Sequence, residues 1–475
     1  MPSRYRRLLP ALLLVPTLAA CSLTPVYQRP ELPMPTSWES QAGSETGETL
    51  PADWWQRFGS AELGGLLNQA LAANHDLAAA ASRIAQARAA VQVAGAARLP
   101  AVEAGASATH SRTDGDTGST GSDSRDALLS VGYELDLWGG NAAARQAAVA
   151  RLAASRYQRE ALALVLQSEV AARYFQILAL RDRLAIARRN LEAAAELLTL
   201  VQVRYDNGAA TALDLAQQRT TLLAIQAGVP ALEQSLIENR NALAILLGQV
   251  PQGFAVSGQS LADISLPAVS LGQPAALLER RPDLRAVEAE LIAANADLGV
   301  ARAALYPSVN LSAAAGVEGV FSGGTSTLAA VTASLAQSVF DGGRRRGQLA
   351  AGEALRQELI ESYAQVLLLG LQEVEDSLSA VASNQARSAI LIEAVTEARE
   401  AYRLAVVRYE AGAEDLLTVL DSQRSRLAAE DSLVQAELAR CAAAVNLYKA
   451  LGGGWAVLPL RSTTDASRLP RVEQG

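Results

Sequence analysis

The sequence predicts a mainly α-helical chain whose few strands belong to a membrane β-barrel. Three observations lead to this fold class: an internal repeat, two segments of unusual helical length, and two pairs of segments with alternating polarity. The repeat is visible where residues 76–100 match residues 283–307. Each half of the chain reads as a helix, a strand pair, a very long helix, a tight turn and a returning helix, so one structural unit occurs twice.

The N-terminus predicts a lipoprotein signal. A basic start precedes the apolar stretch 8–20, which is too short to span a bilayer as a stable helix. It ends in small residues before Cys21, and this pattern resembles the lipobox of bacterial lipoproteins, in which the cysteine thiol is acylated after cleavage. We therefore expect a signal peptide over 1–20, palmitate at Cys21 and a lipidated tether over 21–59. An ordinary signal peptide with an incidental cysteine is the alternative.

The strand pairs are the elements that bear on a membrane. Residues 101–112 and 128–138 alternate small or polar with apolar side chains, and residues 308–319 and 328–340 do the same. Their length suits a tilted membrane strand, whereas soluble hairpins packed on helices are the alternative. Between the first two strands, residues 113–126 are polar and predict a loop. Three acids of these segments are expected to face the interior of the barrel: Glu134, Asp136 and Glu318.

Four strands per chain set a requirement on assembly. A membrane barrel needs about eight strands, and an open edge in lipid leaves backbone groups without hydrogen bonds. No uncharged apolar run of about 18 residues follows residue 20, so any membrane span must be made of strands. Several chains must then pool their strands, and this argument alone leaves dimer, trimer and larger rings open.

Two long segments predict helical hairpins. Residues 141–205 and 344–409 contain no proline and no turn cluster, and about 65 residues at 1.5 Å per residue give about 100 Å of helix. Gly208 and Gly412 follow these segments where a left-handed residue would end each helix. Returning helices are expected over residues 211–248 and 414–451. The whole chain then divides into signal peptide 1–20, tether 21–59, first repeat 60–248, linker 249–273, second repeat 274–455 and tail 456–475.

Composition excludes several functions. The chain has a formal net charge of −8 and no long basic run, so no nucleic-acid partner is expected. Its two histidines and two cysteines lack zinc-site spacing and cannot form a disulfide framework. No G-x-S-x-G motif is present, so a lipid-anchored hydrolase is disfavoured. We expect no catalytic residue, no cofactor, no metal site and no enzymatic activity.

Several motifs recur in order across both halves. They are Trp54–Phe58, LAANHD at 71–76, ERRPDL at 279–284, ALYPS at 304–308, FDGG at 340–343 and the segment 409–424. On these motifs the chain resembles the TolC-like outer-membrane efflux proteins, in their lipidated OprM-like branch, over about residues 21–455. The resemblance implies a homotrimer with a twelve-stranded barrel on a long α-helical barrel. It also implies a cell outer-membrane location, contact with outer-membrane lipid, a periplasmic adaptor protein and an inner-membrane pump, expected to be proton-driven and of the resistance-nodulation-division type.

The resemblance also places a periplasmic gate at the second hairpin tip. By motif, the gate residues match Leu417, Asp421 and Arg424. Spacings of i, i+4 and i, i+3 put all three on one helix face, although a solvated ion pair is the alternative for the two charged residues. Tyr205 and Tyr409 precede the two turns and either support the gate or pack the helix ends.

The predicted function is therefore that of a passive gated duct. It would pass drugs or other small molecules from the periplasm to the exterior as the outer-membrane channel of a tripartite efflux system. The alternatives are a lipoprotein tether without a pore, a duct for metal ions and a duct for type I protein secretion.

Overall fold

The computed structural model describes residues 22–39, 51, 53–116, 118–267, 273–320 and 324–455. The predicted signal peptide 1–20, the predicted lipidation site Cys21 and the tail 456–475 lie outside these residues. None of the helices within the described ranges has the length and hydropathy that a membrane-crossing helix requires.

The chain forms two compact units, and each is described over its described residues. The strand unit comprises Met1–Leu32, Ser82–Tyr157 and Arg285–Gln365, and the hairpin unit comprises Pro33–Ala81, Gln158–Leu284 and Val366–Gly475.

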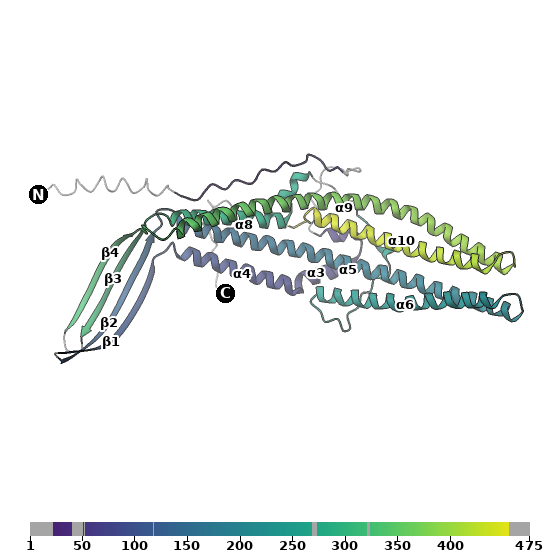
Figure 1. The fold of residues 1–475 in the computed structure, drawn as a ribbon, viewed down its shortest axis with the longest axis horizontal. Helices are drawn as coiled ribbons and strands as arrows, with labels where there is room; N and C mark the ends of the chain where they lie inside the picture. Colours follow the sequence, from purple (N-terminus) through teal and green to yellow (C-terminus); the bar gives the residue numbers. More distant parts are fainter. Residues whose placement is uncertain are drawn as a thin grey trace. The chain divides into compact units, whose positions relative to one another are not determined.

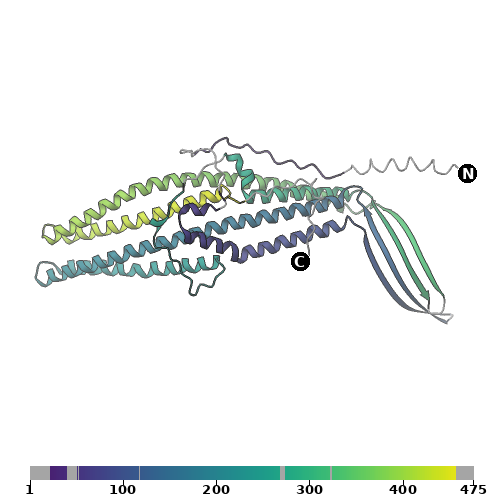
Figure 2. The same ribbon diagram turned by 180° about the vertical axis from the view of Figure 1, so that it is seen from behind.

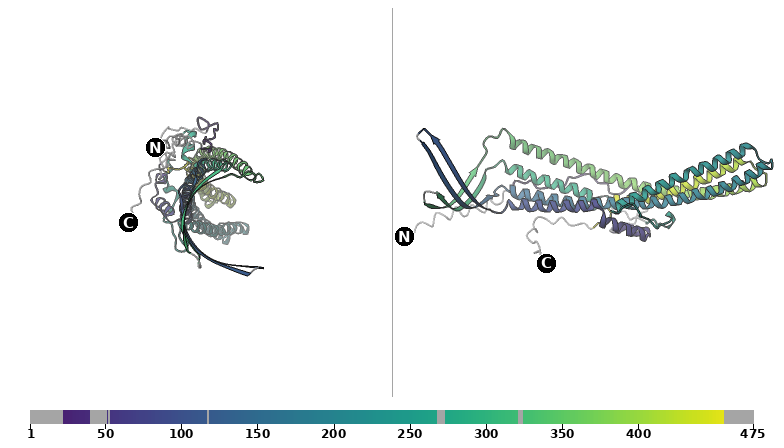
Figure 3. Two further views of the ribbon diagram at one scale, coloured as in Figure 1. Left: turned by 90° about the vertical axis from the view of Figure 1, so that its left-hand side faces the viewer. Right: turned by 90° about the horizontal axis from the view of Figure 1, so that it is seen from below.

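The strand unit contains one antiparallel sheet of four strands. Its strands are β1 (Ala101–Gly115), β2 (Gly118–Leu135), β3 (Ser308–Val320) and β4 (Thr325–Ala336), which pair in the order β1-β2-β3-β4 (Figure 1). The sheet is curved when seen from its end (Figure 3). Because the order follows the chain, β1 and β4 are the two edges.

The strand bounds correct the sequence prediction at the polar loop. Residues 113–126 were expected to be a loop, but they are mostly strand, and the pairing continues as far as Gly115 opposite Gly118. Turn-forming residues are a weak preference, and here the cooperative hydrogen-bond ladder carries past them to a much tighter turn. At the other end β2 stops at Leu135 and not at 138. The predicted fourth strand 328–340 is displaced in the same way, to Thr325–Ala336.

The register gives the sheet two different faces. Leu129, Val131, Tyr133 and Leu135 of β2 share one face, because successive side chains of a strand alternate. Cross-strand partners extend this apolar face through β3 and β4, with Val309, Leu311, Val317, Val331 and Leu335. The opposite face carries mainly polar side chains: Glu103, Ser107, Asp126, Ser130, Glu134, Asn310, Ser312, Glu318, Thr332 and Ser334.

The helices follow the internal repeat. The long helices are α5 (Gly140–Asp206) and α9 (Arg344–Glu410), with 67 residues each, and the returning helices are α6 (Ala212–Leu246) and α10 (Leu416–Ala450), with 35 each. In the hairpin unit they run as two helical hairpins, one from each half of the chain (Figure 2). Shorter elements complete the described chain: η1 (Trp54–Phe58), α3 (Ala61–Ala73), α4 (His75–Ala96), η2 (Leu261–Asp263), η3 (Pro274–Ala276), α7 (Leu277–Arg280) and α8 (Pro282–Ala303).

The base of the hairpin unit has an aromatic core. Trp54 is fully buried and stacks on Tyr448 with ring centroids 5.0 Å apart, while Phe58 packs on Phe175 at 5.3 Å. Burying side chains of this size contributes about 1.5–3 kcal/mol each to folding. This core anchors the roots of α5 and α10 and leaves their far ends to form the hairpin tips.

The described part of the predicted tether is docked on the strand unit. Asn295 of α8 donates a hydrogen bond to the Pro25 carbonyl at 2.7 Å, and Arg29 forms an ion pair with the buried Glu288 at 2.7 Å. Burial and the nearby Glu288 carboxylate raise the pKa of Tyr27. Residues 22–32 are therefore held along α8 by side-chain contacts.

Candidate functional site

The two hairpin tips share one turn geometry. Gly208 and Gly412 have φ of +74° and +72°, in the left-handed region that favours glycine. In each tip the amide after the glycine donates across the turn, from Ala209 to Arg204 at 2.7 Å and from Ala413 to Arg408 at 2.9 Å. A Cβ on either glycine would meet nothing within 4 Å. The backbone angle, and not lack of space, therefore requires glycine at both tips.

An acidic side chain starts each returning helix. Thr211 and Asp214 form a reciprocal capping box at α6. At α10 the Asp415 carboxylate accepts a hydrogen bond from the Thr418 amide at 2.9 Å. Hydrogen bonds from the backbone and side chain of Thr418 lower the pKa of Asp415. Both acids thus serve the helix starts, so the charges available for a gate lie further along the helices.

The predicted gate residues lie on the exposed face of α10. Leu416, Val419 and Leu420 are buried in the tip core. Leu417 is 54% exposed, and Asp421 and Arg424 form an exposed ion pair at 3.1 Å. Within a single chain this pair contributes about 0–1 kcal/mol. The face is thus free to meet other copies of the chain.

A shallow hollow lies between this face and the first hairpin. It has a volume of about 280 Å³, and Leu417 and Arg424 line it together with Thr220 and Thr221 of α6. The gate-face side chains of α10 therefore stand beside α6, where a shift of one hairpin against the other would change their surroundings.

Arg204 joins the two tips and was missed by the sequence reasoning. Its guanidinium lies 4.3 Å from the centroid of the Tyr409 ring and donates to the Glu410 carbonyl at 2.8 Å. Tyr409 is buried, whereas Tyr205 is 41% exposed. The two tyrosines therefore differ in place, and only Tyr409 takes part in the contact between the hairpins. The repeated triplets at 203–205 and 407–409 were the signal that could have drawn attention to this arginine.

One buried glutamine near each tip has a different fate. Gln218 of α6 is fully buried and donates to the Ala194 carbonyl at 2.6 Å. Gln423 of α10, its counterpart in the repeat, is 1% exposed, and neither atom of its amide has a hydrogen-bond partner among the described residues. A buried polar group left unpaired costs about 1–3 kcal/mol. The second tip therefore carries a local destabilisation next to the predicted gate.

Polar contacts above the tips fix the register of the helices. Arg183 of α5 pairs with Asp431 of α10 at 2.6 Å, and Arg399 of α9 pairs with Glu430 at 2.7 Å. Arg426 lies 4.3 Å from the centroid of the Tyr402 ring. These contacts tie α10 to both long helices, so movement of the second tip is expected to hinge below them.

The predicted barrel acids occupy two different settings. The register puts Glu134 and Glu318 on the polar face of the sheet. Asp136, expected within a strand, lies after β2 and accepts hydrogen bonds from the amides of Asn141 at 3.0 Å and Ala142 at 2.7 Å. The strand prediction is wrong there because an acid is most useful at a helix start, where amides lack partners.

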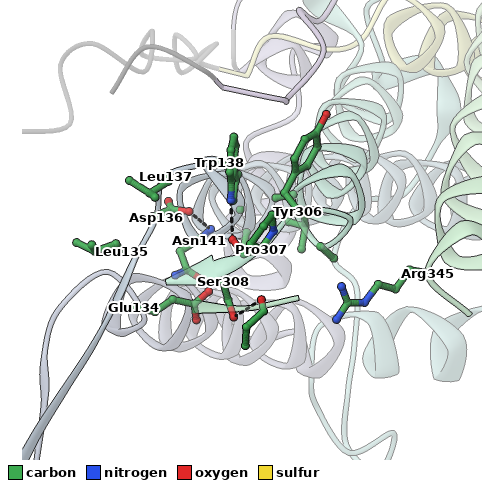
Figure 4. A pocket seen from close by; sticks show the side chains of 16 residues that line it. Glu134, Leu135, Asp136, Leu137, Trp138, Asn141, Tyr306, Pro307, Ser308 and Arg345 are labelled. Carbon is green, nitrogen blue, oxygen red and sulfur yellow. Dashed lines mark hydrogen bonds between the residues drawn. The ribbon is translucent and has the colours of Figure 1, made fainter. Parts of the chain in front are cut away.

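The junction between strands and helices is a built structure (Figure 4). Trp138 donates to the Pro307 carbonyl at 2.7 Å, and its ring stacks on Tyr306 with centroids 4.7 Å apart. Arg345 points toward this group from α9. These contacts join the two repeats at the base of the sheet.

Redox and metal chemistry find little support in the described part of the chain. No group of three or more His, Cys, Asp or Glu side chains there could hold a metal ion. Cys441 is buried, and burial raises the pKa of its thiol to about 12, so the thiol stays protonated at neutral pH.

Comparison with known proteins gives consistent matches. The family described as Outer membrane efflux protein matches residues 66–249 and 274–453. The pyoverdine export outer membrane protein OpmQ of Pseudomonas putida is 41% identical over 92% of this chain and 96% of its own length. The toluene efflux pump outer membrane protein TtgF of the same species is 33% identical over 92% and 95%. Among solved structures, the outer-membrane channel OprN has a TM-score of 0.85 at 31% identity, over 92% of this chain and all of that one.

Proposed function

Because the chain belongs to the outer membrane efflux protein family, we propose that it forms the gated exit duct of a tripartite efflux system. The family places the chain in the cell outer membrane and its function in efflux. The finer statements on assembly, gate, anchor and cargo are argued below.

The sheet is the observation that carries the proposal. Its apolar face stays open to solvent in a single chain, with Leu129 52% exposed, Leu335 70% and Val331 88%. Exposed apolar surface of this extent needs lipid or a partner. The edges β1 and β4 have unpaired backbone groups, which lipid cannot satisfy. Pairing β4 of one copy with β1 of the next removes both problems, and three copies give a closed barrel of twelve strands.

The gate proposal rests on the exposed face of α10. In a closed ring, three copies of Asp421 would approach one another, and like charges at close range repel. Arg424 neutralises part of that charge, while Leu417 narrows the passage. Contacts that favour the open state would then shift the population toward it. We assign those contacts to a periplasmic adaptor protein and an inner-membrane pump of the proton-driven resistance-nodulation-division type. No chemical step is assigned to the chain.

The membrane anchor is a separate part of the proposal. Acylation of Cys21 would hold the N-terminus in the outer membrane, and more than one acyl chain is needed for stable anchoring. Labelled palmitate should enter the wild-type chain and not the Cys21→Ser variant. Equal labelling of both would remove the lipidation site from the account.

Cargo is proposed from relative similarity. The two proteins named for pyoverdine export are 41% and 39% identical to this chain, and those named for solvents or toluene are 31–33% identical. We therefore rank pyoverdine-like cargo before organic solvents. Secreted pyoverdine should fall in a Pseudomonas strain that lacks its own exporter and recover on expression of this chain. Recovery of toluene tolerance alone would reverse the ranking.

Trimer formation and conductance test the duct itself. Native mass spectrometry in detergent should give a mass of three chains, and the same sample should conduct ions in a planar bilayer. A monomer would contradict the shared barrel. A trimer without conductance would favour the lipoprotein tether.

A further inference from the structure

The connection between β4 and α9 combines exposed apolar side chains with free positive charge. Val339 is 95% exposed and Phe340 is 89% exposed, and three consecutive arginines follow at 344–346. We propose that this connection is a binding site for an anionic glycerophospholipid. Arg344 and Arg346 would contact the headgroup phosphate, and Val339 and Phe340 would lie against its acyl chains.

The charge of the only nearby acid is already used. Asp341 accepts hydrogen bonds from the amides of Gly343 at 3.0 Å and Arg345 at 3.2 Å, and it pairs with the Arg345 side chain at 3.7 Å. Arg344 and Arg346 are exposed and have no ion-pair partner among the residues that the structure describes. Two positive charges per chain therefore remain for an external anion. Arginine suits phosphate because its planar fork donates two parallel hydrogen bonds.

The site lies at the level of the membrane surface. The apolar band of β2 runs from Ala127 to Leu135. Nine residues extend about 30 Å along a strand, or about 23 Å across the membrane at a 40° tilt, which is close to the height of a lipid-facing band. Trp138 and Tyr306 stack directly below its end (Figure 4). Aromatic side chains with a polar tip favour the headgroup region, so the arginines of the same unit lie where phosphates are found.

The equivalent connection of the first repeat lacks these features. Between β2 and α5 the single large aromatic, Trp138, is tied to the Pro307 carbonyl, and residues 141–144 of α5 carry no positive charge. A general need for charge at strand-to-helix connections would affect both repeats. The restriction to the second repeat indicates one lipid site per chain.

The alternative occupant is the next copy of the chain. Acidic side chains of a neighbour could neutralise Arg344 and Arg346, and the arginines would then support assembly. Charge complementarity with an anionic leaflet favours the lipid, because Val339 and Phe340 offer a neighbouring acid no matching contact while they suit acyl chains.

The test compares lipid binding by the intact oligomer. Purified full-length chain in detergent is mixed with dioleoyl-phosphatidylglycerol or dioleoyl-phosphatidylcholine, and bound lipid is counted by native mass spectrometry. The wild type should retain phosphatidylglycerol at least about fivefold more than phosphatidylcholine, and high salt should reduce this preference. Arg344→Gln with Arg346→Gln should abolish it, and Arg344→Lys with Arg346→Lys should keep most of it.

The matched control removes two other exposed charges of the same helix, with Arg356→Gln and Arg387→Gln. This control should bind lipid as the wild type does. No preference in the wild type, or an equal loss in the control, would overturn the proposal. An Arg344/Arg346 variant that loses the oligomer and not the lipid would assign these arginines to the contact between copies. The assay measures no transport, so its outcome is independent of the proposed duct.

Discussion

The two hairpin tips are built on the same backbone but carry different side chains. Both have a left-handed glycine and an acidic start to the returning helix. At the positions that match Leu417 and Asp421, however, the first tip has Ala212 and Ala216. Its Arg219 donates to Gln202 at 2.9 Å within its own hairpin, whereas the matching arginine of the second tip pairs with an acid on the exposed face. The repeat thus preserves the scaffold and places the gate charges on one hairpin.

The shared scaffold predicts equal and large effects at the glycines. Gly208→Ala and Gly412→Ala should each destabilise the folded chain by about 1–2 kcal/mol, because a side chain at positive φ meets its own backbone. Denaturant unfolding of the detergent-solubilised protein measures this. A cost at only one tip would show that the turns are not equivalent.

The contact between the tips predicts the next effect. Arg204→Gln removes a cation–π contact and a hydrogen bond, which together contribute about 1–2 kcal/mol. The open probability in bilayers should rise several-fold. Arg408→Gln is the control, because Arg408 pairs with Glu414 within the second tip at 3.3 Å and does not join the hairpins. A similar rise in both variants would remove the special role of Arg204.

The paired glutamines predict effects of opposite sign. Gln218→Met should destabilise the chain by about 1 kcal/mol, since the Ala194 carbonyl loses its donor. Gln423→Met should stabilise it by up to about 1 kcal/mol, since a buried unpaired amide is replaced by a side chain of similar size. Thermal unfolding of the two variants side by side provides the measurement. Destabilisation by Gln423→Met would mean that this amide has a partner in the assembled duct.

The smallest effect concerns acid. Hydrogen bonds hold the pKa of Asp415 below its usual value, so its contribution is present above pH 4 and is lost as the pH falls through the lowered value. Asp415→Asn should therefore flatten the loss of stability below pH 4. An unchanged acid limb, followed by circular dichroism, would contradict the capping role.

Much of the fold follows from sequence pattern, and the mainly helical fold class with its small sheet is confirmed. Periodicity and the absence of proline identify α5 and α9 because each is long and continuous. The pattern failed where local preference competes with pairing: residues 113–126 look like a loop but complete a β ladder, and Asp136 looks like a strand residue but starts a helix. The role of Arg204 could not be predicted, because it depends on which segments of two distant repeats meet. The burial of Gln423 without a partner depends on packing in the same way.

Single-channel conductance in planar bilayers tests the central claim that the gate charge lies on the second hairpin alone. Wild type is compared with Asp421→Ala and with Asp206→Ala, which removes an exposed acid from the first tip that accepts a hydrogen bond from Gln202 four residues earlier. The account predicts a small, mostly closed conductance for the wild type and for Asp206→Ala, and longer or larger openings for Asp421→Ala. Equal conductance of all three, or an equal rise in both variants, would contradict it.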